Sequence, residues 1–116
     1  MTDGTQFEQR EIVFTPVIYS NLKKVKKRPV LILSNNRFNS RSEDLICCSI
    51  TSNLNRREGI SITQADMEEG KIYFDSRVKP SSIHTLNKSL IEKKLGKLRS
   101  LKTHQVIEEL NKLLGQ

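Results

Sequence analysis

Two short runs of the chain are apolar on both faces, and they limit the fold more than any other feature. They are "VLIL" at residues 30–33 and "LICCSI" at residues 45–50. Because successive side chains of a β-strand point to opposite faces, strands of this kind must be covered on both sides. In a chain of 116 residues, they predict a small closed or half-closed barrel, with a helix or another subunit packed outside it.

Length and hydropathy predict a single domain over residues 1–116, because a chain of this size buries one compact core. No stretch approaches the ~20 apolar residues that a membrane span requires. The opening segment "MTDGTQFEQR" lacks the apolar region of a secretory signal peptide. We therefore expect a cytoplasmic protein with no membrane association.

The rest of the pattern is mainly β. The segment "IVFTPVIYS" at 12–20 is rich in strand-forming residues, and Pro16 within it predicts an edge strand, a bulge or a break, because proline cannot donate to a ladder. The polar residues 34–44 predict a loop, with or without one turn of helix, and Gly70 is the expected pivot of a later turn. Further short extended segments are expected at 60–62, 76–86 and 90–98.

One amphipathic helix is expected to close the chain. Ser100 is the expected N-cap and Gly115 the stop signal. Between them, apolar residues recur at helical spacing: Leu101, Val106, Ile107, Leu110, Leu113 and Leu114. We expect this stripe to pack on the barrel as part of the core. The predicted fold class is therefore mainly β (α+β), a small barrel with a C-terminal amphipathic helix.

The two cysteines, Cys47 and Cys48, are adjacent. Neighbouring residues in a strand point to opposite faces, so a disulfide between them would be strained. Neither has a second cysteine or a nearby histidine at metal-ligand spacing. We expect two reduced thiols packed as small hydrophobes, and neither a metal site nor a cofactor.

The formal net charge of +7 is unevenly distributed. Residues 23–41 hold seven cations and no acid, residues 76–102 hold eight cations and one acid, and residues 42–75 hold seven acids and three bases. If the fold brings the two basic segments together, they form a groove suited to a polyanion. The alternative is that the lysines are scattered over the surface and serve solubility.

Candidate chemistry lies where the two apolar strands begin and end. Arg28 directly precedes "PVLIL", and Thr51, Ser52 and Asn53 follow "LICCSI". If these strands pair in antiparallel fashion, Arg28 and Thr51 meet at one rim of the barrel, where a guanidinium and a hydroxyl can hold one phosphate. Alternatively, Arg28 is only the end of a charge run. His84, near the second basic segment, is a weaker candidate for contacting a ligand.

Several short elements occur in an order that resembles the MazF/PemK family of toxin endoribonucleases. They are "KKRPVLILSNNRFN", "DLICCSITSN" and "SRVKPSSIHTLNKSLIEKKLGKL". The resemblance covers about residues 10–114. It implies an SH3-like barrel that forms a homodimer and cleaves single-stranded RNA, including mRNA, without a metal ion.

The resemblance also implies roles for individual residues. Arg28 and Thr51 fall on the catalytic arginine and threonine of the family, and the RNA 2′-hydroxyl would attack the adjacent phosphate. The residues expected to bind RNA are Lys23, Lys24, Lys26, Lys27, Ser52, Asn53, Arg77, Lys79 and His84. The implied partner is an acidic, partly disordered antitoxin. RNA specificity is expected in the loops at 20–27, 34–43 and 52–59.

One alternative function stays open at the level of sequence. Charge and fold suit a catalytically inactive SH3-like barrel that binds RNA or a protein equally well. The segment before Arg28 is entirely basic, so it offers no carboxylate for acid–base chemistry. Only Arg28 and Thr51 favour the enzyme.

Overall fold

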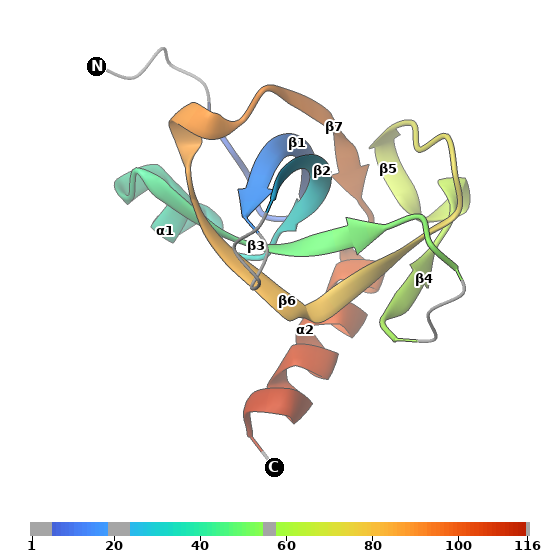
Figure 1. Ribbon diagram of the computed structural model, residues 1–116. Helices are drawn as coiled ribbons and strands as arrows, with labels where there is room; N and C mark the ends of the chain where they lie inside the picture. The colour runs from blue at the N-terminus through green and yellow to red at the C-terminus, as the bar shows by residue number, and fades with distance from the viewer. Residues whose placement is uncertain (1–5, 19–23, 55–57, 116) are drawn as a thin grey trace.

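The computed structural model describes residues 6–18, 24–54 and 58–115. Seven antiparallel strands form one curled sheet, a half-barrel whose edges are β4 and β5, in the order β4-β6-β3-β2-β1-β7-β5 (Figure 1). The strands are β1 (Glu11–Ile18), β2 (Val25–Ile32), β3 (Asp44–Thr51), β4 (Ile60–Ile62), β5 (Met67–Gly70), β6 (Ser76–Asn87) and β7 (Lys93–Leu98). The helices are α1 (Asn36–Arg41), α2 (Ser100–Leu114) and the 3-10 turns η1 (Gln64–Asp66) and η2 (Lys88–Leu90). The predicted mainly β fold class is confirmed.

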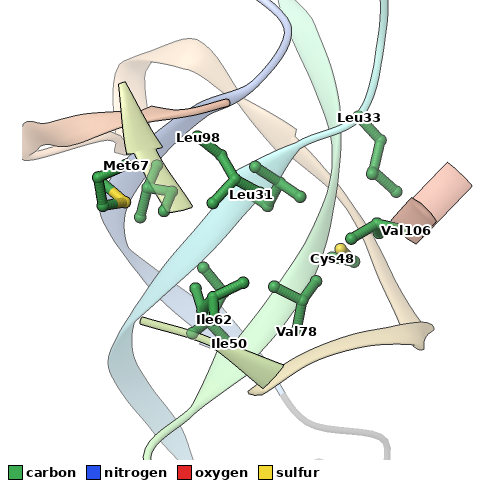
Figure 2. Packing of buried hydrophobic residues seen from close by; sticks show 10 residues of the cluster. Leu31, Leu33, Cys48, Ile50, Ile62, Met67, Val78, Leu98 and Val106 are labelled. Atoms are coloured by element: carbon green, nitrogen blue, oxygen red, sulfur yellow. The ribbon is translucent and has the colours of Figure 1, made fainter. Parts of the chain in front are cut away.

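The sheet buries a core on each of its two faces. The first core lies on the side that α2 covers, and Figure 2 shows its packing; it contains Ile12, Leu31, Leu33, Cys48, Ile50, Ile62, Met67, Val78, Leu98 and Val106. The second core, on the opposite face, contains Val13, Val17, Val30, Ile32, Leu45, Cys47 and Leu86. Each apolar strand therefore contributes alternate residues to two cores, as its sequence predicts.

The apolar strands are covered within a single chain. Val30, Leu31 and Ile32 are all fully buried, so no second subunit is needed to cover them. Cys47 and Cys48 are likewise buried and free, one in each core, so the prediction of reduced, packed thiols is confirmed. A homodimer, if it forms, needs a different surface.

The leucine stripe expected on α2 is only partly core. Thr103 and Val106 are buried and Ile107 and Leu110 pack against the first core, but the outer leucines are exposed: Leu101, Leu113 and Leu114. For Leu113 and Leu114 the reason is visible in Figure 1, where the C-terminal half of α2 extends beyond the sheet. The helix ends at Gly115 as expected, while its N-cap is Arg99 and Ser100 is already helical.

Local features of the strands follow from their sequences. Pro16 lies inside β1, opposite Lys27, in the part of the strand that β7 does not pair with, so the missing N–H disrupts no ladder. The polar loop after β2 contains one short helix, α1, which the Asn35 side chain caps. Gly70 adopts a φ of 79°, and a β-carbon there would meet the Leu95 carbonyl oxygen at 2.3 Å, so this turn requires glycine. No helix in the described residues is long and apolar enough to span a membrane.

Candidate active site

Thr51 is the last residue of β3, whereas Arg28 lies inside the neighbouring strand β2 and not before it, as its sequence had suggested. β2 and β3 pair in antiparallel fashion through Val30↔Ser49, Leu31↔Cys48 and Ile32↔Cys47. Continuing this register by two positions brings Arg28 across from Thr51. Both residues are half-buried, and by alternation both lie on the face that carries the second core. The predicted antiparallel pairing of the two strands is therefore present, with Val30↔Ser49 as the pair nearest to Arg28 and Thr51.

β6 adds two more cations to this face on the far side of β3. Thr51 pairs with Arg77, and Ser49 pairs with Lys79. Because cross-strand partners share a face, Arg28 and Arg77 flank Thr51 from either side. The Nε of Arg77 is buried and makes no hydrogen bond within the described residues, and its Nη1 makes only a 3.4 Å contact with the Gly59 carbonyl. The guanidinium thus has donors available for an anion.

Thr51 is oriented by the turn that follows it. The backbone N–H of Asn53 donates to Thr51 Oγ1 at 3.1 Å, a local hydrogen bond that threonine commonly makes at the end of a strand. Since the oxygen accepts this bond, the hydroxyl proton remains available to donate. Ser52 and Asn53 are exposed beside it. The turn therefore presents a hydroxyl donor between the two arginines.

His84 lies in a cluster of hydroxyl groups next to this site. Its Nε2 is 2.8 Å from Ser49 Oγ and 3.3 Å from Ser82 Oγ, and the Ser82 hydroxyl donates to Ser49 Oγ at 3.0 Å. A register shift in β6 between the partners of Cys48 and Ser49 brings Ser82 into the cluster. Burial lowers the pKa of His84 below its usual value, which favours the neutral imidazole at pH 7.

The lysines beside Arg28 do not share one environment. Lys26 and Lys27 belong to the first half of β2 and not to a loop, while Lys24 precedes the strand. Lys24 and Lys26 are exposed and form no ion pair with a described residue. Lys27 points to the opposite face from Arg28 and pairs with Glu92 at 2.9 Å. Lys23 lies outside the described residues.

The two basic segments come together only in part. β2 and β6 are separated by β3, so Arg28, Arg77 and Lys79 share one face without pairing directly. The other cations of the second segment lie on η2, β7 and α2 or directly before α2. Three of these lysines pair with acids: Lys94 with Glu11, Lys97 with Glu8 and Lys102 with Asp66. Fewer cations therefore share one face than the sequence suggests, and they are the ones around Thr51: Arg28, Arg77 and Lys79.

Two exposed aromatic residues lie beyond the same rim, and the sequence argument did not single them out. Tyr73 and Phe74 are 84% and 73% exposed in the loop between β5 and β6, three to four residues before Arg77. Exposed rings beside a cationic site are suited to stacking on nucleobases. Within the described residues, no group of three or more His, Cys, Asp or Glu side chains is placed to hold a metal ion.

Comparison with known proteins identifies the family to which the chain belongs. A family model for the PemK-like, MazF-like toxins of type II toxin–antitoxin systems matches residues 8–114. The chain belongs to this family. The resemblance read from the short motifs is thus confirmed, and the protein is a toxin of the MazF/PemK type. No curated protein sequence matches the chain.

Solved structures of this toxin type share the fold. An endoribonuclease from a mycobacterial species, in complex with its cognate antitoxin, is 19% identical, with a TM-score of 0.73 over 96% of this chain and 95% of that one. A MazE–MazF complex from Deinococcus radiodurans is 20% identical, with a TM-score of 0.70 over 97% and 99%. A MazF toxin from Mycobacterium tuberculosis is 19% identical, with a TM-score of 0.71 over 90% and 96%. At these identities the likeness establishes the fold.

Proposed function

We propose that this toxin is an endoribonuclease that cleaves single-stranded RNA, with mRNA as its cellular substrate, and that it needs no metal ion. The observation that carries the proposal is the position of Arg28 and Thr51 on one face, with Arg77 beyond Thr51 and no described acid paired to either arginine. MazF-like relatives described as endoribonucleases add support from the family.

The proposed reaction is attack of an RNA 2′-hydroxyl on the adjacent phosphate. It leaves a 2′,3′-cyclic phosphate and a free 5′-hydroxyl. Arg28 stabilises the charge that develops on the phosphate oxygens and donates a hydrogen bond to the leaving 5′-oxygen. Thr51 holds a phosphate oxygen. Fixed donors of this kind replace the charge neutralisation that a metal ion would supply.

The bound RNA extends from this phosphate along the cationic face. Lys79 and Lys26 are placed for neighbouring phosphates, and the rings of Tyr73 and Phe74 offer surfaces on which unpaired bases stack. Single-stranded RNA fits this surface better than a duplex, since stacking on side chains needs bases that are not already stacked.

The proposed partners are an acidic, partly disordered antitoxin and a second copy of the toxin. The antitoxin would occupy the cationic face, and the relatives solved in complex with antitoxins support this partner. The second copy would cover the end of α2, where Leu113 and Leu114 are 62% and 72% exposed. We place the toxin in the cytoplasm, where mRNA is available.

The alternative is a barrel that binds RNA or a protein without cleaving it. The same cations and rings serve such a module. The two functions differ in the chemistry at Arg28, because a binding module needs only its charge, whereas catalysis needs its planar fork at a defined phosphate.

The deciding experiment incubates the purified toxin with a long unstructured RNA, with and without excess EDTA, and maps the ends of the products. We expect cyclic phosphate and 5′-hydroxyl ends at equal rates in both conditions. Arg28→Ala, purified in the same way, is the control for a contaminating nuclease. Cleavage that is lost on chelation and restored by magnesium or manganese contradicts the mechanism, and RNA binding without cleavage supports the binding module.

A further inference from the structure

The proposed reaction needs a group that accepts the proton of the 2′-hydroxyl, and the arginines cannot serve. A guanidinium stays protonated in proteins. The described acids that form ion pairs do so with other cations, and none pairs with Arg28, Arg77 or Lys79. Another group on this face can supply the acceptor.

The hydroxyl cluster beside Thr51 supplies one. Ser49 and Thr51 are two residues apart in β3, so their side chains share a face about 7 Å apart along the strand. The Ser82 hydroxyl donates to Ser49, which leaves the proton of Ser49 to point at Nε2 of His84. These contacts form a chain of hydrogen bonds from Ser82, which is partly exposed, through buried Ser49 to a ring nitrogen.

We propose that the chain Ser82–Ser49–His84 accepts the proton of the attacking 2′-hydroxyl, an inference that rests on the proposed function. The 2′-hydroxyl gives its proton to Ser82 Oγ, Ser82 passes its own proton to Ser49, and Ser49 passes its own to Nε2. The bond from the 2′-oxygen to phosphorus forms as the bond to the 5′-oxygen breaks. The 5′-oxygen takes a proton from water, and the resulting hydroxide removes the proton from the imidazolium.

The surroundings of His84 suit this role. Across the ladder it pairs with Cys47, whose burial raises the pKa of the thiol to about 12, so this thiol stays neutral. The charged groups on the same face of these strands are Lys79 and Arg77 on β6 and Arg28 and Lys26 on β2. Neutral imidazole is the form that can accept a proton, and burial lowers the pKa of His84 in that direction.

The chain allows a clean test because it has only two histidines. The other, His104, is exposed on α2 and serves as the matched control. The experiment measures single-turnover cleavage of a long unstructured RNA from pH 5 to 8.5 by the wild type, His84→Gln, His104→Gln and Ser82→Ala. Glutamine can keep a hydrogen bond to Ser49 but cannot take up the proton.

We expect the wild type and His104→Gln to share a rate that rises with pH and levels off above the pKa of His84. His84→Gln should be about 10²–10³-fold slower at pH 7.5, within the range for general-base catalysis, and should lose the rising limb. Ser82→Ala should slow cleavage about tenfold or more, as loss of one member of a catalytic hydrogen-bond chain does.

A His84→Gln variant that keeps the wild-type pH dependence overturns the inference, even if it is slower. If that variant does not fold, an NMR titration of His84 in the wild type decides, because its pKa must coincide with that of the rate profile. A wild type that binds RNA without cleaving it contradicts the proposed function. A wild type that cleaves with no contribution from His84 contradicts only this inference.

Discussion

The two faces of the sheet carry the same kind of core but differ at one end. On the first-core face, apolar residues run without interruption across the strands to α2, as Figure 2 shows for Leu31, Cys48 and Val78. On the second-core face, the apolar cluster stops at Val30 and Cys47, and polar residues continue in its place: Arg28, Ser49, Thr51, Arg77, Lys79 and His84. In our proposal, one face therefore serves stability alone, and the other serves stability at one end and chemistry at the other.

This difference has a simple origin in strand alternation. The half of β2 with buried residues is apolar on both faces, while its first half carries Lys26 and Arg28 on one face and Lys27 on the other. An ionised side chain costs little at the open end of the sheet and much inside a core. The end of the sheet is thus where cations can be held in fixed positions without being buried, and variants on the two faces should fail in different ways.

The largest expected effect is on catalysis at Arg28. Arg28→Ala should reduce single-turnover cleavage by roughly 10²–10³ while RNA binding stays within about tenfold, as expected for removal of one transition-state donor. Arg28→Lys should not restore activity, because an ammonium lacks the planar fork. Thr51→Ala should likewise slow the cleavage step and leave RNA binding largely unchanged. The double variant should lose less activation free energy than the two single variants together, since both residues act on one phosphate.

The melting temperature is the control for this series, since half-buried Arg28 is in neither core. We expect Arg28→Ala to change the free energy of unfolding by no more than about 0.5 kcal/mol. If the variant only weakens binding and leaves the cleavage step intact, Arg28 is simply the end of a charge run, and the binding module becomes the better description.

The opposite failure is expected at Leu31, which is fully buried in the first core. Leu31→Ala should lower the free energy of unfolding by about 2–5 kcal/mol, the usual cost of a cavity of this size. Cleavage per folded molecule should stay unchanged at low temperature. Urea unfolding measures the stability, and single-turnover assays on the folded fraction measure the activity. A loss of cleavage per folded molecule would show that the first core also contributes to activity, contrary to this expectation.

Much of this division could be predicted from the sequence. Apolar runs at 30–33 and 45–50 predict strands buried on both sides, and antiparallel pairing of the two predicts that Arg28 and Thr51 meet. Alternation alone also places Ser49 on the face of Thr51. These features depend on the local periodicity of apolar residues and on the pairing of two strands, and both can be inferred from one sequence.

The rest depends on contacts between distant segments. Ser82 reaches Ser49 only because three residues, Pro80, Ser81 and Ser82, intervene between the β6 partners of two consecutive β3 residues. The acid that pairs with Lys27 is Glu92, 65 positions later in the chain. The exposed end of α2 has the same helical spacing as its buried part, so periodicity cannot tell how far the sheet extends beneath it.

A smaller effect is expected from the outer end of α2. Leu113→Glu and Leu114→Glu should weaken the proposed homodimer by about tenfold or more each, the cost of losing a buried apolar contact at an interface. Leu101→Glu, at the other end of the helix, is an equally exposed control and should leave assembly unchanged. Sedimentation at micromolar concentration measures the effect, and a wild type that is only monomeric removes the homodimer from the proposal.

The smallest effect compares two adjacent lysines that alternation sends to opposite faces. Lys26 lies on the face of Arg28 with no described ion-pair partner, whereas Lys27 pairs with Glu92. Lys26→Ala should weaken RNA binding about two- to fivefold, on the scale of one exposed charge contact, and should lower the salt slope by ~0.7 for one lost phosphate contact on a single strand. Lys27→Ala should change neither quantity, because its charge is already neutralised and faces away from the phosphate.

Binding titrations from 50 to 200 mM salt with both variants measure the difference directly. Equal effects from the two lysines would mean that RNA responds to the total charge of the segment and not to the position of each lysine on one face. This outcome would contradict the proposed path of the RNA along β2.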